Sequence, residues 1–268
     1  MKERSDILVI DDEQVIVEAV DKICKLEDYP VDAALNVKTA LEKISKHHYP
    51  IIICDIMLPD GDGFQILTKL QKINYNTALI MMTGYSTVEN AVNSLYQGAI
   101  DFIPKPFTVD ELLSSVVRTQ KYLEIKKKQA EIFKQNNKND LLYVTCPSKY
   151  LRLGYLSWVM QENDGSVLIG ACDLFLKTIE SVKEIELQST DEEIAQGVSC
   201  VIIKSDDERI HKILSPVSGR IIEVNQKIIH NPNIIEKDPY FEGWIYRVIP
   251  ADIGYETKFL IPCSSDRL

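Results

Sequence analysis

The residues best suited to chemistry lie in the first half of the chain, each directly after an apolar run. They are Asp11 and Asp12 after one run, Asp55 after a second, Thr83 after a third and Lys105 after a fourth. Clustered carboxylates favour Mg²⁺, a hard cation that often joins carboxylates to phosphate oxygens. An ammonium and a hydroxyl beside such an ion would complete a site for phosphoryl transfer.

The elements that must position these residues alternate regularly between residues 1 and 122. Strand-like runs at 7–10, 31–35, 51–54, 78–82 and 99–103 alternate with segments of helical periodicity at 14–27, 37–47, 63–73, 87–97 and from 108 onward. This alternation predicts an α/β doubly wound fold with a five-stranded parallel sheet. Because the carboxyl ends of parallel strands share one edge, the five residues should converge there. Singly, each has a plain explanation as a helix cap, a turn or an exposed side chain, but their joint placement predicts a site.

Residues 5–122 resemble the receiver domain of two-component response regulators. The similarity lies in segments 8–13, 53–63, 82–85 and 101–107. It implies a flavodoxin-like fold in which Asp55 accepts a phosphoryl group from a sensor histidine kinase or a phosphotransfer protein. It also implies that Asp12, Asp55 and the backbone carbonyl of Met57 ligate Mg²⁺, while Asp11 reaches the ion directly or through water.

The resemblance also assigns the groups that sense phosphorylation. Lys105 would pair with one phosphoryl oxygen, and the hydroxyl of Thr83 would donate to another. Phe102 stands at the family's aromatic switch position, where Tyr is common, and its plain reading is a buried strand residue. The Lys105–Pro106 bond is expected to be cis.

The second half of the chain differs in composition. Residues 123–140 read as a helical extension into a polar linker, and residues 141–268 read as a mainly β domain with a short helix within 172–183. Val116, Leu123 and Ala130 fall at heptad spacing, so a homodimer through this helix is an alternative to a solvated linker.

Residues 149–252 resemble the H protein of the glycine cleavage system, a lipoyl carrier. The similarity lies in segments 157–159, 169–173, 215–225, 231–232, 238–240 and 242–244, and it implies a barrel-sandwich hybrid fold. In that family lipoate is attached to a lysine seven residues before the serine at Ser215. Counting back gives Glu208, and counting forward from 193–194 gives Asp207. A carboxylate cannot form this amide, so we expect no lipoate.

Two features near this position leave alternatives open. Lys204 and Lys212 flank the acidic tip at 205–209 and are the lysines that could substitute. The tip itself reads either as a solvated turn or as a docking element for a partner. His211 follows the tip, and a single histidine on a strand is more often a packed residue than a phosphotransfer group.

Composition limits the function further. The 268 residues carry a net charge of −10, divided as −6 in 1–122, +2 in 123–140 and −6 in 141–268. An acidic chain repels phosphate backbones, which argues against DNA binding. No apolar run is long enough to span a membrane, and no leader is evident. The six cysteines lie far apart and lack the close spacing of zinc ligands. These features favour a cytoplasmic protein with reduced thiols.

The combined prediction is a response regulator of a phosphorelay, a signalling switch and not an enzyme, although the receiver assists its own phosphoryl transfer and hydrolysis. Its output would be a non-lipoylated H-protein-like domain that acts through an unknown downstream protein. The alternatives are a lipoyl carrier regulated by the receiver and a DNA-binding regulator with an unrecognised fold.

Overall fold

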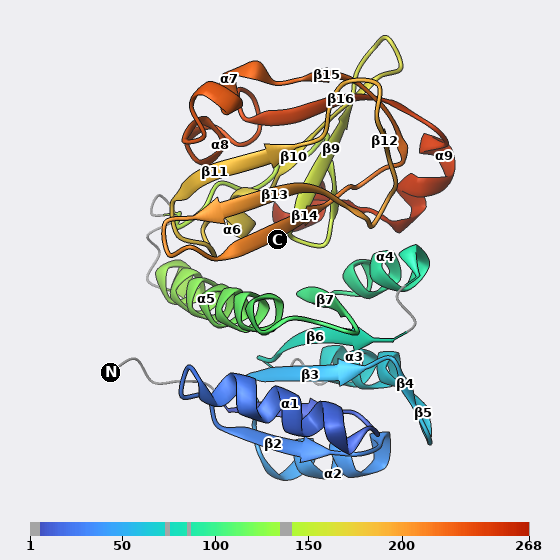
Figure 1. Cartoon of the computed structure of the whole chain (residues 1–268), viewed down its shortest axis with the longest axis vertical. Helices are drawn as coiled ribbons and strands as arrows, with labels where there is room; N and C mark the ends of the chain where they lie inside the picture. Colours follow the sequence, from blue (N-terminus) through green and yellow to red (C-terminus); the bar gives the residue numbers. More distant parts are fainter. Residues whose placement is uncertain (1–5, 73–75, 85–86, 135–140, 268) are drawn as a thin grey trace.

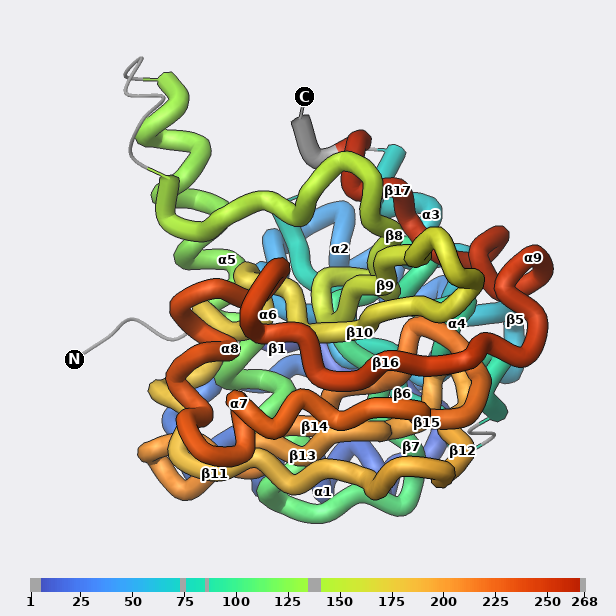
Figure 2. Tube along the Cα trace, turned by 90° about the horizontal axis from the view of Figure 1, so that it is seen from above, coloured from blue at the N-terminus to red at the C-terminus, as the bar shows by residue number. Residues whose placement is uncertain are grey.

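The computed structural model describes residues 6–72, 76–84, 87–134 and 141–267. Tyr85 of the predicted motif and residues 135–140 of the predicted linker lie outside them. The described residues form an N-terminal α/β domain and a C-terminal mainly β domain, stacked with α5 (Val109–Lys134) between them (Figure 1). Seen from above, the C-terminal domain lies across the N-terminal one, and the end of α5 extends past it (Figure 2).

A parallel sheet organises the N-terminal domain, as predicted. Among the described residues its five strands run in the order β2-β1-β3-β6-β7. Their bounds are β1 Ile7–Ile10, β2 Val31–Ala34, β3 Ile51–Asp55, β6 Ala78–Thr83 and β7 Asp101–Pro104, and a short hairpin of β4 (Met57–Leu58) and β5 (Gly61–Asp62) follows β3. The strand order reverses between β1 and β3, which places a crevice at their carboxyl ends.

Helices cover both faces of this sheet, which explains why its strands read as continuous apolar runs. Alternate residues of β1 face opposite sides: Ile7 and Val9 pack in one cluster with α1 (Gln14–Lys25) and α5. Leu8 and Ile10 pack in the other with α2 (Val37–Lys46) and α3 (Gly63–Lys72).

Two antiparallel sheets form the C-terminal domain. Among the described residues, one has the strand order β12-β15-β16-β10-β9-β8-β17 and the other the order β11-β13-β14. The strands are β8 Leu151–Leu153, β9 Ser157–Gln161, β10 Val167–Ala171, β11 Val182–Leu187, β12 Glu193–Ile194, β13 Ser199–Ser205, β14 Ile210–Leu214, β15 Gly219–Val224, β16 Trp244–Pro250 and β17 Ile261–Pro262. The helices are α6 Asp173–Leu176, α7 Gln226–His230, α8 Ile234–Lys237, α9 Ile253–Glu256, η1 Thr257–Phe259 and η2 Cys263–Arg267. The mainly β prediction is confirmed, and α6 is the short helix expected within 172–183.

The helix α5 is more than a solvated linker. It continues to Lys134, and Tyr122 and Leu123 pack against the core of the C-terminal domain. The ring of Tyr122 lies 5.1 Å from that of Tyr155. Val116 is fully buried in the N-terminal core, so it cannot serve in a heptad seam between two chains. The sequence pattern missed this packing because it shows spacing along the helix and not which surface covers it.

The helix α4 (Val88–Tyr96) makes the second contact between the domains. Val92 and Leu95 are buried in the same apolar cluster as the C-terminal core. Gly197, which Val92 approaches, has φ +76°, and a Cβ built there would lie 2.6 Å from Val92 Cγ2. Glycine is therefore required both for its backbone conformation and for the closeness of α4.

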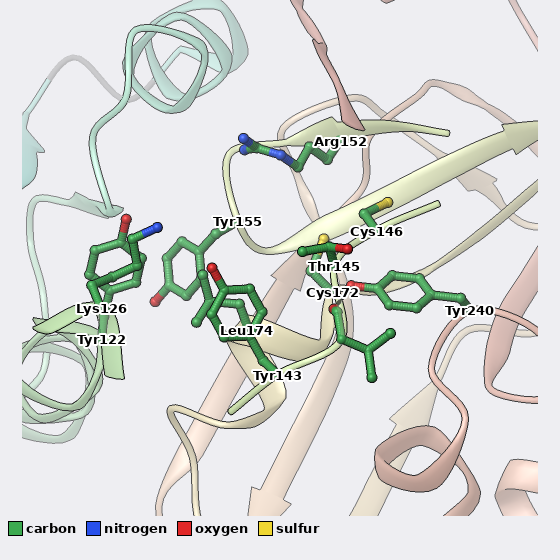
Figure 3. Close-up of a pocket in the computed structure, with 11 residues that line it drawn as sticks. Tyr122, Lys126, Tyr143, Thr145, Cys146, Arg152, Tyr155, Cys172, Leu174 and Tyr240 are labelled. Carbon is green, nitrogen blue, oxygen red and sulfur yellow. Dashed lines mark hydrogen bonds between the residues drawn. The ribbon is translucent and has the colours of Figure 1, made fainter. Parts of the chain in front are cut away.

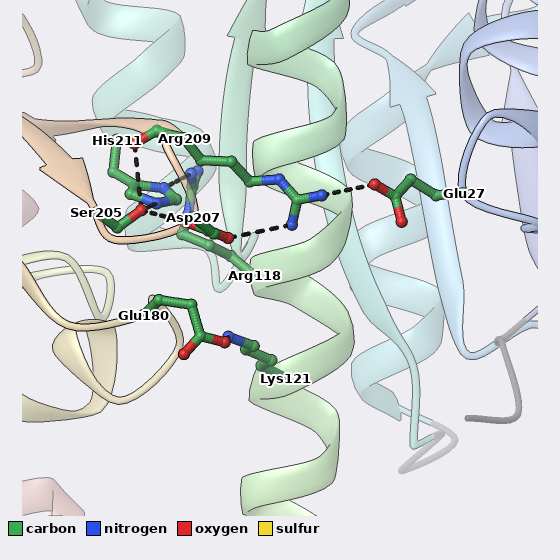
Figure 4. Close-up of polar contacts among 8 residues, drawn as sticks. All are labelled: Glu27, Arg118, Lys121, Glu180, Ser205, Asp207, Arg209 and His211. Carbon is green, nitrogen blue, oxygen red and sulfur yellow. Dashed lines mark hydrogen bonds and ion pairs between the residues drawn. The ribbon is translucent and has the colours of Figure 1, made fainter. Parts of the chain in front are cut away.

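A buried polar contact joins α5 to the hairpin β13–β14 (Figure 4). Arg118 pairs with Asp101 of β7 and donates from Nη1 to Nδ1 of His211 at 3.0 Å. Because a guanidinium only donates, Nδ1 must accept, so His211 is neutral and carries its proton on Nε2. That nitrogen lies 3.0 Å from Ser205 Oγ. His211 is thus a packed residue that lies at the domain interface.

We expect this contact to weaken in acid. Burial, and then the charge of Arg118, lower the pKa of His211 from 6.5 to about 3, while Asp207 opposes this and Arg209 and Lys121 add to it. Since the folded pKa lies below the unfolded one, the stabilisation is present above about pH 6.5 and is lost as the pH falls toward 3. Between about pH 7 and pH 5 the free energy of unfolding should fall by about 2 kcal/mol from this group.

Urea denaturation at both pH values measures this loss. His211→Gln should remove it, whereas His230→Gln, which changes an exposed histidine on α7, should keep it. Equal pH dependence in wild type and His211→Gln would contradict the assignment.

Candidate functional site

The predicted acidic and basic residues meet at the carboxyl edge of the parallel sheet. Lys105 Nζ lies 2.6 Å from Asp55 Oδ2 and 2.7 Å from Asp11 Oδ2, and 3.4 Å from Oε1 of Glu13. The side chain of Lys105 is 7% exposed. Glu13 is a participant that the sequence pattern did not single out, although it directly follows Asp11-Asp12.

Three carboxylates form a group suited to a cation. One oxygen from each of Asp11, Asp12 and Asp55 lies within 4.8 Å of the others, with Asp12 exposed and the other two buried. Lys105 is the ammonium that pairs with Asp11 and Asp55. All the donor atoms are hard oxygens, so the residues fit Mg²⁺.

The protonation of this group reflects burial and charge together. Burial raises the pKa of Asp11, against hydrogen bonds from Lys105 and from the backbone N–H of Glu13. Burial alone would lower the pKa of Lys105, but its hydrogen bonds to Asp11 and Asp55 raise it above its ordinary value. The ammonium is therefore charged, and the excess negative charge on the carboxylates favours a second cation.

The loop after β3 holds Asp55 in position. The backbone N–H of Met57 donates to Asp55 Oδ1 at 3.1 Å. Gly63 packs so closely that a Cβ there would lie 2.2 Å from the carbonyl oxygen of Asp55. Met57 thus lies beside the site, while the role of its carbonyl as a metal ligand stays a prediction.

Thr83 and Phe102 lie on the neighbouring strands. Thr83 ends β6, is fully buried, and its carbonyl accepts from the backbone N–H of Lys105 at 2.8 Å. Phe102 lies on β7, opposite Met81, and is half-buried. The Lys105–Pro106 bond is cis, as the resemblance implies. The switch roles of Thr83 and Phe102 stay predictions.

A cavity of about 640 Å³ lies between the domains on the Phe102 side. Its walls include Phe102 and Pro104 from β7 and Ile202 and Ile210 from the hairpin β13–β14. Glu111 and Lys212 line it as well and form an ion pair of 2.6 Å across the interface. Phe102 and the hairpin β13–β14 therefore border the same cavity.

The acidic tip is the turn of this hairpin. Asp207 and Glu208 lie between β13 and β14, at the place where the resemblance puts the carrier's lysine. Glu208 pairs with Lys183 and Lys204, which lower its pKa to about 2. Asp207 pairs with Arg209, so both carboxylates at this position are engaged by basic side chains of their own domain.

The tip also contacts the N-terminal domain. Arg209 Nη2 lies 2.7 Å from Glu27 Oε1, next to the end of α1 (Figure 4). Away from the tip, a further ion pair joins Lys121 of α5 to Glu180 at 2.5 Å. These residues are up to 182 positions apart, so no spacing in the sequence indicated that they would meet.

Comparisons with known proteins divide the chain in the same way. The response regulator receiver domain model matches residues 7–117, and the glycine cleavage H-protein model matches residues 149–263. The transcriptional regulatory protein DltR of Streptococcus agalactiae is 35% identical over 127 residues, which are 47% of this chain and 57% of DltR. The chain thus spans little more than half the length of that relative.

Two further proteins match one half of the chain each. A glycine cleavage system H protein of Saccharolobus solfataricus is 38% identical over 104 residues, 39% of this chain and 75% of that protein. The solved receiver domain of the Francisella response regulator 1452 is 30% identical with a TM-score of 0.42, covering 46% of this chain and 99% of that one. Separately, none of the helices among the described residues has the length and apolar character to cross a membrane.

We expect removal of one carboxylate to weaken Mg²⁺ binding. Asp12→Asn takes one charge from the cluster and keeps the side-chain shape, so the dissociation constant should rise on the order of tenfold or more. Asp62→Asn, an exposed acid on β5 outside the cluster, is the control. Isothermal titration calorimetry with Mg²⁺ measures both, and equal affinities in the two variants would refute the site.

Proposed function

The chain belongs to the response regulator receiver family through residues 7–117 and to the glycine cleavage H-protein family through residues 149–263, and on this basis we propose a phosphorylation-dependent switch with an H-like output. We propose that it divides into a receiver at 1–122, a helical connection at 123–140 and an output domain at 141–268. The observation that carries the proposal is the meeting of Asp55, Asp11 and Lys105 at one edge of the parallel sheet, next to the strand β7 that borders the interdomain cavity.

The receiver would take its phosphoryl group on Asp55. The carboxylate oxygen attacks the phosphorus of a phosphohistidine on a sensor kinase or phosphotransfer protein, and the imidazole leaves. Mg²⁺ bound to Asp11, Asp12 and Asp55 would supply charge neutralisation for this transfer. Lys105 would pair with a phosphoryl oxygen and Thr83 would donate its hydroxyl to another.

The added phosphoryl group would change the face that holds the output domain. It brings a charge of about −1.5 to −2 next to Lys105, which is now paired with Asp55 and Asp11. Movement of Lys105 and Thr83 would shift the ends of β6 and β7 and with them Phe102 at the interdomain cavity. To move the domains from a 1:99 to a 99:1 population of the open form, phosphorylation must favour that form by about 5.5 kcal/mol.

The output domain would act through a protein partner and without lipoate. The tip holds Asp207 and Glu208, and neither can form the amide. Lys204 is paired with Glu208, and Lys212 is paired with Glu111 across the interface. Opening of the interface would release Lys212 from Glu111 and uncover the face of the hairpin that lines the interdomain cavity. The surface available to a partner would then differ between the closed and the open form. We place this relay in the cytoplasm, and a homodimer is one form of the open state.

The alternative is a lipoyl carrier that the receiver controls, since Lys204 and Lys212 still flank the tip. Intact-mass analysis after incubation with a lipoate ligase separates the two readings. A lipoyl adduct on either lysine would contradict the proposal and support the lipoyl-carrier alternative. The acidic charge of residues 141–268 disfavours the third reading, a DNA-binding output.

We expect acetyl phosphate and Mg²⁺ to phosphorylate the wild-type protein once. Mass spectrometry should find one phosphoryl group, and it should be lost in Asp55→Asn because an amide is not a nucleophile of this kind. Asp62→Asn should be phosphorylated like wild type. Phosphorylation of Asp55→Asn at an unchanged level would refute the assignment of the acceptor.

We expect a larger side chain at Gly197 to loosen the packing of the C-terminal domain against α4, as opening of the interface would. Gly197→Ala places a Cβ against Val92 and strains a residue at φ +76°, so amide exchange in β13 and β14 should rise on the order of tenfold. Gly165→Ala carries a similar strain at φ +88° with nothing within 4 Å of its Cβ, and it should leave that exchange unchanged. Hydrogen-exchange mass spectrometry compares the two variants; the same change in both would mean that the packing against α4 does not hold the hairpin.

A further inference from the structure

Two cysteines from opposite ends of the C-terminal domain meet in its interior. Cys146 lies in the segment between α5 and β8, and Cys263 is the first residue of η2. Their Sγ atoms lie 2.7 Å apart although the residues are 117 positions apart. Both side chains are buried, and the structure holds both as thiols.

The backbone brings these sulfurs together independently of any bond between them. The N–H of Cys263 donates to the carbonyl of Tyr150 at 3.1 Å. The strand before it, β17, pairs with β8, so Pro262 lies opposite Leu151. A disulfide needs both side chains to approach about 2.05 Å between sulfurs without backbone movement. The fold therefore supplies the approach that a disulfide requires.

One of the two sulfurs can be reached through a small cavity. The cavity has a volume of about 130 Å³, and Cys146 lines it together with Cys172 and Tyr240 (Figure 3). Lys126 from α5 and Arg152 also line it, and the described lining residues include no carboxylate. The thiolate is the form of a cysteine that reacts with oxidants. Cys263 does not line the cavity and is fully buried.

We propose that Cys146 and Cys263 are a redox site that closes to a disulfide when a small hydroperoxide enters this cavity. The thiolate of Cys146 attacks one oxygen of hydrogen peroxide, forming an S–O bond, breaking the O–O bond and releasing hydroxide, which takes up the proton that the thiol lost and leaves as the first water. The thiol of Cys263 then attacks the sulfenic sulfur, forming the S–S bond and releasing a second water. Two thiols and one peroxide thus give one disulfide and two waters, and the two sulfurs supply the two electrons.

The bond would close a loop over nearly the whole C-terminal domain. It ties the segment that follows α5 to the strand β17, and a cross-link of this length stabilises mainly by restricting the unfolded chain. Tyr122 and Lys126 of α5 border the same cavity. Oxidation would therefore fix a wall of the cavity that α5 borders. This inference does not depend on the proposed phosphoryl switch.

The test uses the full chain, reduced and then treated with a small excess of hydrogen peroxide. Remaining thiols are alkylated in denaturant, and the protein is weighed and mapped without reduction. We expect two of the six cysteines to escape alkylation, a linked peptide pair containing Cys146 and Cys263, and full recovery with dithiothreitol. The thermal midpoint of the oxidised protein should rise by roughly 5–10 °C.

Matched variants assign the bond. Cys146→Ser and Cys263→Ser should each keep all remaining thiols after peroxide treatment, whereas Cys200→Ser, which changes a buried cysteine on β13, should still form it. The wild-type peptide map decides the question even where a serine variant folds poorly. Six alkylated cysteines after oxidation, or a link from Cys146 to Cys172 instead, would overturn the proposal.

Discussion

The arrangement of the two domains depends on how the charge of Arg118 is satisfied. Arg118 is 6% exposed, and a charge removed from water is tolerated only when it is paired and hydrogen-bonded. Its carboxylate partner, Asp101, belongs to the sheet of the receiver, and its neutral acceptor, His211, belongs to the output hairpin. The contact therefore forms only when both domains are in place and His211 is uncharged. Protonation of His211 would remove its hydrogen bond to Arg118 and weaken the interface.

The strand β7 links this contact to the phosphoryl site. It begins at Asp101, carries Phe102 toward the interdomain cavity, and leads directly into Lys105 beside Asp55. The acceptor Asp55 lies on β3, but its partner Lys105 directly follows β7, whose first residue, Asp101, pairs with Arg118. In the proposed switch, one short strand therefore separates the partner of the acceptor from the domain interface.

The tip of the β13–β14 hairpin is held against the N-terminal domain. A carrier needs a lysine that is free to swing, whereas this tip holds Glu208 between two lysines and extends Arg209 to Glu27 of the receiver. Exposed ion pairs contribute little stability individually. Together with the apolar packing of α4 against Gly197, they orient the hairpin on its own receiver.

The sequence by itself determined the parallel sheet, the convergence of Asp11, Asp55 and Lys105, and the carboxylates at the hairpin tip. It could do so because short stretches of sequence specify each strand and turn, and because the carboxyl ends of parallel strands lie at one edge of the sheet. Only the tertiary structure decided that α5 is packed between the domains, that His211 meets Arg118, and that two distant cysteines adjoin. Those contacts join surfaces whose match depends on the shapes of both domains, and no local pattern in the chain encodes that match.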